Sequence, residues 1–144
     1  MLKLKYLSEP KAAQSVRFAR QGKFTKAYQP KKNHEWKAWI KIQTIAQLPD
    51  DFKMRTTAIQ IVKCHFVFSP LKSFSKKKMK MIEDGHIFYK TTRPDLQDNL
   101  MKIFIDSLSG IVFKDDSQIV KVNNTAKYYG LQAMIILELQ EVNQ

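Results

Sequence analysis

The clearest sign of regular structure in this sequence is a helical repeat between Leu96 and Leu108. Apolar residues recur there at steps of three and four, the spacing of one face of an α-helix, and Gly110 follows as a stop signal. A helix with one apolar face needs a second layer in which to bury it. The rest of the chain must therefore supply that layer.

Four other stretches have the composition or alternation of β-strands and can form the second layer. Ala58 to Phe68 is dense in β-branched and aromatic residues, with Val62, Cys64, Phe66 and Phe68 expected on one face. Leu131 to Glu141 alternates, with Leu131, Ala133, Ile135, Leu137 and Leu139 expected to point inward. The remaining two candidate strands are Leu2 to Leu7 and Ser117 to about Asn124.

Two more helices are predicted between these strands. One runs from Asn33 to about Leu48, with Trp36, Trp39, Ile40 and Ala46 roughly on one side; the other is a short basic helix within Ser73 to Ile82. Ser8 to Lys32 has no sustained periodicity and is interpreted as a surface loop. The order of elements predicts the α/β (α+β) class, a small mixed sheet of about four strands with helices packed on it. A chain of 144 residues fits one domain, residues 1–144.

The charge of the chain points to a polyanionic partner. Lys and Arg number 25 against 13 Asp and Glu, which leaves a net charge of +12. No apolar run approaches the ~20 residues of a membrane span, so no membrane association is expected. The first residues do not resemble a secretory signal, so a cytoplasmic location is expected. The one cysteine, Cys64, cannot form a disulfide within the chain, and no Cys/His cluster suits zinc.

Acidic residues are scarce in this chain, yet five of them fall in one short window. They are Asp95, Asp98, Asp106, Asp115 and Asp116. Carboxylate oxygens are the ligands that Mg²⁺ prefers, and such an ion can polarise a phosphate and activate water. Acids inside a basic surface therefore favour metal-assisted phosphodiester hydrolysis.

Structural roles for the same acids remain open alternatives. Asp95 and Asp98 stand three residues apart at a helix start, as in a capping box. Asp98 and Lys102 could form an ordinary helix ion pair. Asp115 and Asp116 are neighbours at a strand entry and would point to opposite faces, so one is expected to be catalytic and the other structural.

The window resembles the RusA family of Holliday-junction resolvases, whose pattern is P-D-x-D-N-x-x-K followed downstream by D-D-x-Q. Asp98-Asn-Leu-Met-Lys102 matches D-N-x-x-K, and Lys114-Asp-Asp-Ser-Gln118 matches the downstream part. The resemblance implies that Asp98, Asp116 and Asp95 bind the metal and that Lys102 is also required for cleavage. Here Asp95 and Asp98 are separated by one residue more than in D-x-D. Asp95 is therefore either a ligand with altered geometry or only a helix cap.

The resemblance implies a crossover junction endodeoxyribonuclease that resolves four-way DNA junctions by paired nicks in recombination and repair. It further implies Mg²⁺, with Mn²⁺ as a substitute, a homodimer, and no small-molecule cofactor. The alternatives are a non-enzymatic nucleic-acid-binding module and a metal nuclease for other branched DNA. The residues expected to bind DNA are Arg17, Arg20, Lys23, Lys26, Lys31 and Lys32 in the first loop, and Lys76, Lys77 and Lys78 in the second basic run.

Overall fold

The computed structural model describes residues 1–12, 17–22, 24–28 and 31–143. Its strands are β1 (Leu2–Tyr6), β2 (Arg17–Gln21), β3 (Phe24–Tyr28), β4 (Ile59–Phe68), β5 (Phe88–Tyr89), β6 (Ile119–Val122), β7 (Thr125–Tyr129) and β8 (Met134–Glu141). Its helices are α1 (Lys31–Gln47), α2 (Lys76–Glu83) and α3 (Lys102–Leu108), with a π-helical turn η1 (Leu96–Met101) and a 3-10 turn η2 (Asp116–Gln118). None of the described helices is long and apolar enough to cross a membrane.

A mixed sheet of six strands forms the centre of the fold. Its order is β1-β8-β4-β7-β5, and β6 also pairs with β4. β4 is antiparallel to β8 and parallel to β6 and β7. The α/β class is therefore confirmed, although the sheet has more strands than the four expected. The additional strands are β5 and β7, which the sequence patterns did not separate from their neighbours.

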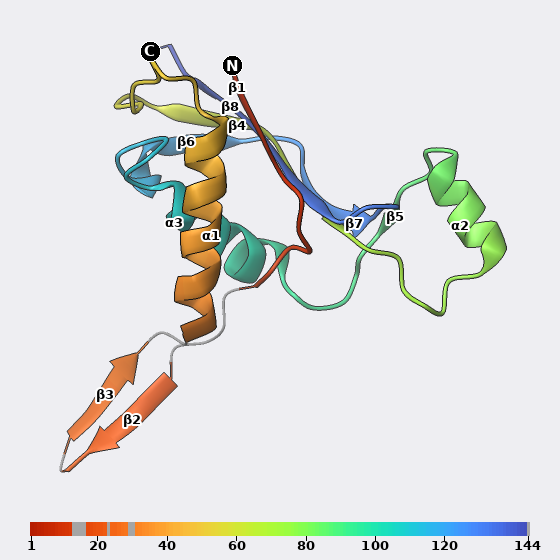
Figure 1. The fold of residues 1–144 in the computed structure, drawn as a ribbon, viewed down its shortest axis with the longest axis horizontal. Helices are drawn as coiled ribbons and strands as arrows, with labels where there is room; N and C mark the ends of the chain where they lie inside the picture. The colour runs from red at the N-terminus through yellow and green to blue at the C-terminus, as the bar shows by residue number, and fades with distance from the viewer. Residues whose placement is uncertain (13–16, 23, 29–30, 144) are drawn as a thin grey trace.

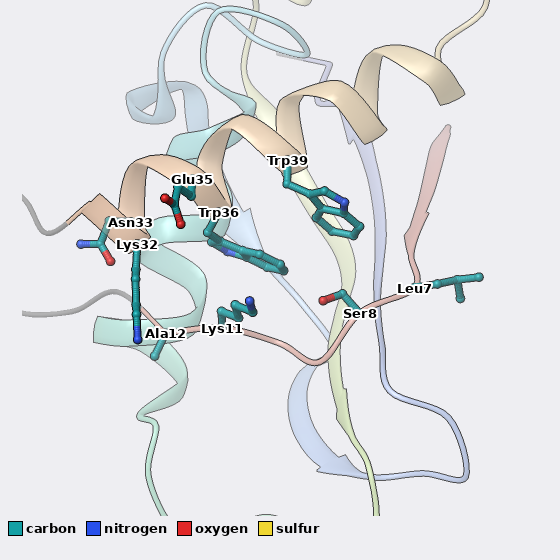
Figure 2. A pocket seen from close by; sticks show the side chains of 9 residues that line it. All are labelled: Leu7, Ser8, Lys11, Ala12, Lys32, Asn33, Glu35, Trp36 and Trp39. Carbon is teal, nitrogen blue, oxygen red and sulfur yellow. The ribbon is translucent and has the colours of Figure 1, made fainter.

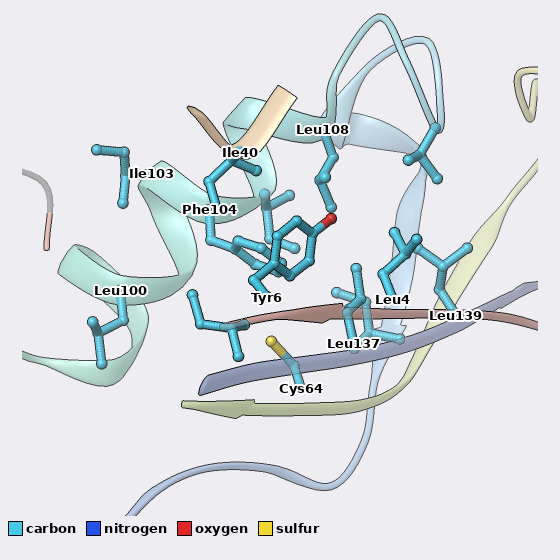
Figure 3. Packing of buried hydrophobic residues seen from close by; sticks show 14 of the residues in the cluster. Leu4, Tyr6, Ile40, Cys64, Leu100, Ile103, Phe104, Leu108, Leu137 and Leu139 are labelled. Carbon is cyan, nitrogen blue, oxygen red and sulfur yellow. The ribbon is translucent and has the colours of Figure 1, made fainter. Parts of the chain in front are cut away.

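α1 and α3 cover one face of this sheet (Figure 1). Figure 3 shows the core between the two layers, with strand side chains such as Leu137 and Cys64 facing Phe104 and Leu108 of α3. Burying a large apolar side chain stabilises a fold by about 1.5–3 kcal/mol. The fully buried side chains of the core are Leu4, Tyr6, Ile40, Ile59, Ile61, Cys64, Phe66, Leu100, Phe104, Leu108, Val112, Phe113, Ile135, Leu137 and Leu139.

A buried hydrogen-bond network joins β1 to α1. The Tyr6 hydroxyl lies 2.6 Å from Thr44 Oγ1, which itself donates to the Ile40 carbonyl oxygen at 2.7 Å. Burial raises the pKa of Tyr6 to about 12, so the phenol stays protonated. The prediction that Ala46 shares one side of the helix with Trp36 and Ile40 is wrong, because Ala46 is exposed and Thr44 is the buried residue of this turn.

The inward face of β4 changes register in the middle of the strand. Ile61 pairs with Leu139 and Lys63 pairs with Glu138, so Val62 is an extra residue at a bulge. Ile59 and Ile61 before the bulge, and Cys64 and Phe66 after it, are buried. The prediction that Val62 shares the buried face of Cys64 is therefore wrong.

The basic segment before α1 is not the irregular loop that the sequence suggested. β2 and β3 pair as an antiparallel hairpin, with Arg17 opposite Tyr28 and Gln21 opposite Phe24. Gly22, with φ +60°, lies between the two strands in a conformation that favours glycine. Figure 1 shows the hairpin projecting away from the sheet beyond the N-terminal end of α1.

Candidate active site

The helix that carries the acidic motif begins with a π-helical turn. The Leu100 amide donates to the Asp95 carbonyl oxygen at 3.1 Å, five residues back instead of four. Such a turn holds one residue more than an α-helical turn, and π turns are frequent at functional sites. The extra residue between Asp95 and Asp98 is therefore absorbed locally, and Leu100, Ile103 and Phe104 still reach the core.

Asp95 occupies the N-cap position of this turn without capping it. Its side chain accepts no capping hydrogen bond from the helix, and its own amide donates to Asn99 Oδ1 at 3.3 Å. The capping box, which was the structural alternative for Asp95 and Asp98, is absent here. Asp98 and Lys102 are both exposed and form no ion pair with each other. Asp95 and Asp98 are thus both exposed to solvent at the start of the helix.

The segment that leads into Asp95 is held by two lysines, one in β7 and one directly after β5. Lys127 of β7 donates from Nζ to the carbonyl oxygens of Thr92 and Pro94, each at 2.7 Å. Lys90 Nζ adds a bond to Thr92 Oγ1 at 3.0 Å. Hydrogen bonds from a charged donor contribute more than neutral ones. The position of Asp95 is therefore fixed from a strand, through a lysine that the sequence patterns did not single out.

Asp115 and Asp116 lie at a 3-10 turn, where Asp115 has a structural role. Its carboxylate accepts from the Ser117 amide and hydroxyl, while the Gln118 side chain accepts from the Asp115 amide at 2.8 Å. The Ser117 hydroxyl is the main cause that lowers the pKa of Asp115 below its usual value. Asp116 is exposed at the first position of the turn. Of the two neighbours, Asp115 is the structural one, although the turn replaces the expected strand.

The three acids of the predicted metal site do not gather in one group. Gln118 Nε2 donates to the Arg55 and Thr57 carbonyl oxygens, just before β4 begins, at 3.1 and 2.9 Å. Lys127, which holds the Asp95 segment, pairs with Phe66 near the other end of β4. β4 has 10 residues and is roughly 30 Å long. Within the described ranges, no three His, Cys, Asp or Glu side chains are placed to hold a metal ion.

Asp106, the remaining acid of the window, joins two helices. It pairs with Lys37 of α1, and Lys41 Nζ donates to the Ser107 carbonyl oxygen at 3.1 Å. Cations near a helix C-terminus are favourable because the last carbonyl groups carry partial negative charge. Asp106 therefore contributes to the packing of α1 on α3.

Those of the residues expected to bind DNA that the structure describes lie on four elements, β2, β3, α1 and α2. Arg17, Arg20 and Lys26 belong to the strands of the hairpin, and Lys23 lies outside the described residues. Lys31 and Lys32 are exposed at the start of α1, where Lys31 lies 3.7 Å from Glu35. Lys76 and Lys77 are exposed at the start of α2, which Ser75 caps. Lys78 differs from these two, because its Nζ lies 4.0 Å and 4.6 Å from the ring centres of Phe74 and Phe88.

Comparisons with known proteins agree with the motif. The family model of the endodeoxyribonuclease RusA matches residues 8–140. The uncharacterized protein YqaN of Bacillus subtilis (strain 168) is 37% identical over 71 residues, which are 49% of this chain and 48% of that protein. The chain therefore spans about half the length of this relative. Since the family model covers most of the sequence, the chain belongs to the RusA endodeoxyribonuclease family.

Proposed function

We propose that this protein is a magnesium-dependent, structure-selective endonuclease that resolves four-way DNA junctions by paired symmetric nicks, in recombination and repair. The observation that carries the proposal is the Asp95–Asp98 pair at the start of η1. The Asp95 side chain makes no capping hydrogen bond, Asp98 makes no ion pair with Lys102, and both acids stand in a chain of net charge +12. Membership of an endodeoxyribonuclease family supports the same reaction class.

The donor set suits magnesium better than a metal that needs a complete protein cage. Mg²⁺ is usually held by one or two carboxylates together with waters and substrate phosphates, and two carboxylates three residues apart can supply that. A bound ion would polarise the scissile phosphate and lower the pKa of an attacking water. We assign Asp95 and Asp98 to this role, with Mn²⁺ as a substitute ion. Lys102, exposed at the start of α3, would balance charge that develops on the phosphate.

Asp116 is the third proposed ligand, and it lies on a separate element. η2 holds it exposed, and its neighbour Asp115 has its carboxylate engaged in the capping box. Asp116 is thus the member of the acidic pair that is available to a metal or to DNA. Because Asp116 is separate from the Asp95–Asp98 pair, the effect of its substitution on cleavage tests the proposed ligand set more sharply than substitution of Asp98.

Point variants test the site directly. We expect Asp98→Asn and Asp116→Asn to abolish Mg²⁺-dependent cleavage of a four-way junction while junction binding is kept, because each removes a ligand charge without a change in size. Asp50→Asn is the matched control, an exposed aspartate in the turn after α1. Cleavage by Asp98→Asn at the control rate would refute the assignment of the metal site.

We further propose that the active form is a homodimer. Four-way junctions have near-twofold symmetry and need nicks in two opposed strands, while one chain presents one site. A closed twofold dimer presents the same site twice through a self-complementary interface. Sedimentation equilibrium at micromolar protein tests this. A monomer that still makes paired nicks would contradict it.

A further inference from the structure

A pocket of about 700 Å³ opens between the N-terminal half of α1 and the segment that follows β1. Figure 2 shows the indoles of Trp36 and Trp39 extending from α1 toward this segment, which carries Ser8 and Lys11. The volume lies within the range of about 300–1,000 Å³ that is usual for sites binding small ligands. The pocket is separate from the Asp95–Asp98 pair, neither of which lines it.

The floor of this pocket is an aromatic platform. Trp36 and Trp39 stack with ring centres 5.3 Å apart and an angle of 16° between their planes. Trp36 is almost fully buried, while Trp39 is only partly buried and keeps part of its surface toward the pocket. Trp39 thus packs against the core and still leaves part of its ring uncovered. The half-open indole pair is instead suited to a flat ring that stacks on it.

The rim of the pocket is cationic. Lys11 Nζ lies 5.8 Å from the ring centre of Trp36, and Lys32 enters from the first turn of α1 (Figure 2). Among the described residues of the lining, the one acid is Glu35, whose carboxylate lies 3.7 Å from Lys31. Lys11 and Lys32 therefore leave an excess of positive charge beside the stacked rings. A ligand that fits both features carries a planar ring and an anionic group close to it.

We propose that this pocket binds one unpaired nucleotide of the DNA substrate, with the base against Trp39 and the flanking phosphates on Lys11 and Lys32. A paired base cannot present its face to an indole, because its neighbours in the duplex already cover it. Stacking on aromatic side chains is tolerant of sequence, as recognition of branched DNA by shape requires. The proposal rests on the proposed function, since it takes DNA as the substrate.

The position of the pocket in the fold supports this occupant. It lies at the N-terminal end of α1, from which the β2–β3 hairpin projects (Figure 1). The hairpin carries Arg17, Arg20 and Lys26. A DNA strand that runs along the hairpin toward α1 would therefore reach the two indoles. Bases beside a branch point leave the stack at the lowest cost, which makes them the natural occupants.

The two tryptophans of the chain both line this pocket, so the tryptophan emission of the protein reports on this site. The experiment consists of two titrations of the full chain in buffer that contains EDTA. One adds a short dye-labelled oligothymidylate, and the other adds a dye-labelled blunt duplex. Dye anisotropy would follow binding in the same samples. Bound oligothymidylate should quench the tryptophan emission, and bound duplex should leave it unchanged.

Variants give the second readout. Trp39→Ala should weaken oligothymidylate binding about fivefold or more, while Trp39→Phe, which keeps a ring, should restore most of it. Lys11→Gln and Lys32→Gln, at exposed positions, should each lower the salt slope of binding by about 0.7. Lys53→Gln is the matched control, an exposed lysine beyond the far end of α1.

Tryptophan emission that stays unchanged when anisotropy shows that oligothymidylate binding is saturated would overturn the proposal. The proposal would also be overturned if the salt slopes of Lys11→Gln and Lys32→Gln equalled that of Lys53→Gln. Junction cleavage with Mg²⁺ is measured separately on the wild-type chain. If cleavage occurs but the emission stays unchanged, the pocket is wrong and the nuclease stands. If quenching occurs but no DNA is cut, the nuclease is wrong and the pocket stands as a nucleic-acid-binding site.

Discussion

The role of the single residue Asp95 does not follow from its position in the acidic motif. Its spacing to Asp98 suits a helix cap as well as a metal ligand, and a sequence cannot separate the two because both need a carboxylate at a helix start. The structure shows the N-cap position with no capping hydrogen bond from the side chain. That observation removes the structural explanation and leaves the chemical one as our proposal.

Substitution of Asp95 tests this division. Asp95→Ala should leave thermal stability nearly unchanged, well short of the about 1 kcal/mol that loss of a true cap costs, because no cap bond is lost. Loss of a residue that only supports a metal ligand lowers activity roughly ten- to hundredfold. Loss of Asp95, a proposed ligand, should lower Mg²⁺-dependent cleavage by at least as much. Thermal melts and cleavage rates would be compared with those of Asp50→Asn. A destabilised variant with full activity would make Asp95 a cap.

Asp115 provides the opposite case, an acid whose role is local structure. Its pKa is lowered mainly by the Ser117 hydroxyl, so the ionised form is favoured in the folded state. The resulting stabilisation is present above the usual aspartate pKa of about 3.9 and is lost as the pH falls through the lower folded value. Asp115→Ala should therefore reduce the free energy of unfolding at pH 7, with a difference that shrinks in acid. Urea melts at several pH values measure it, and an equal loss at pH 7 and in strong acid would contradict it.

At the scale of elements, the π turn η1 explains how the helix accepts one extra residue. The turn closes over five residues, so the apolar positions after it keep their place in the core. Deletion of Gln97 should convert η1 into an ordinary α-helical turn while Leu100 and Phe104 stay buried. We expect a cooperative thermal transition and an unchanged helical circular dichroism. Loss of the folded state on deletion would show that the π turn is required by the packing.

The periodic elements of the fold could be predicted from the sequence, and the irregular features could not. The helix over Leu96 to Leu108 follows a repeating apolar pattern, the strand over Ala58 to Phe68 follows from its composition, and the basic helix lies within Ser73 to Ile82; all three are present. The bulge at Val62 is a local shift set by pairing with β8, which a one-strand pattern does not contain. Thr44 is buried because Tyr6 of a distant strand supplies its hydrogen-bond partner.

The candidate site was predictable in its chemistry and less so in its arrangement. The scarcity of acids in a basic chain pointed to a window of five aspartates, and the resemblance to the RusA family implied Asp95, Asp98 and Asp116 as the ligands. The distances between these three depend on where η1 and η2 are anchored. Lys127, which holds the Asp95 segment, has no sequence signature, because it acts on backbone carbonyl groups from a separate strand. The Trp36–Trp39 pair had the spacing of an ordinary core face, and only the fold shows that Trp39 is partly open.

At the scale of the whole molecule, the net charge of +12 predicts a steep dependence of DNA binding on salt. Each phosphate neutralised on a duplex arm contributes about −0.9 to the slope of log affinity against log salt. About six contacts would lower affinity roughly a thousandfold between about 50 and 200 mM salt. Anisotropy titrations of a labelled junction measure the slope. A flat dependence would contradict a binding surface made of Lys and Arg side chains.

The most direct test of the proposed activity uses the unmodified protein and three DNA substrates. A four-way junction, a flap and a blunt duplex would be incubated with purified protein, with Mg²⁺ and with EDTA, and the cut strands mapped at single-nucleotide resolution. We predict symmetric nicks in two opposed strands of the junction, only with Mg²⁺, and little cutting of the duplex. Absence of cleavage on all three substrates, or cleavage of the junction and the duplex at equal rates, would contradict a junction-resolving endonuclease.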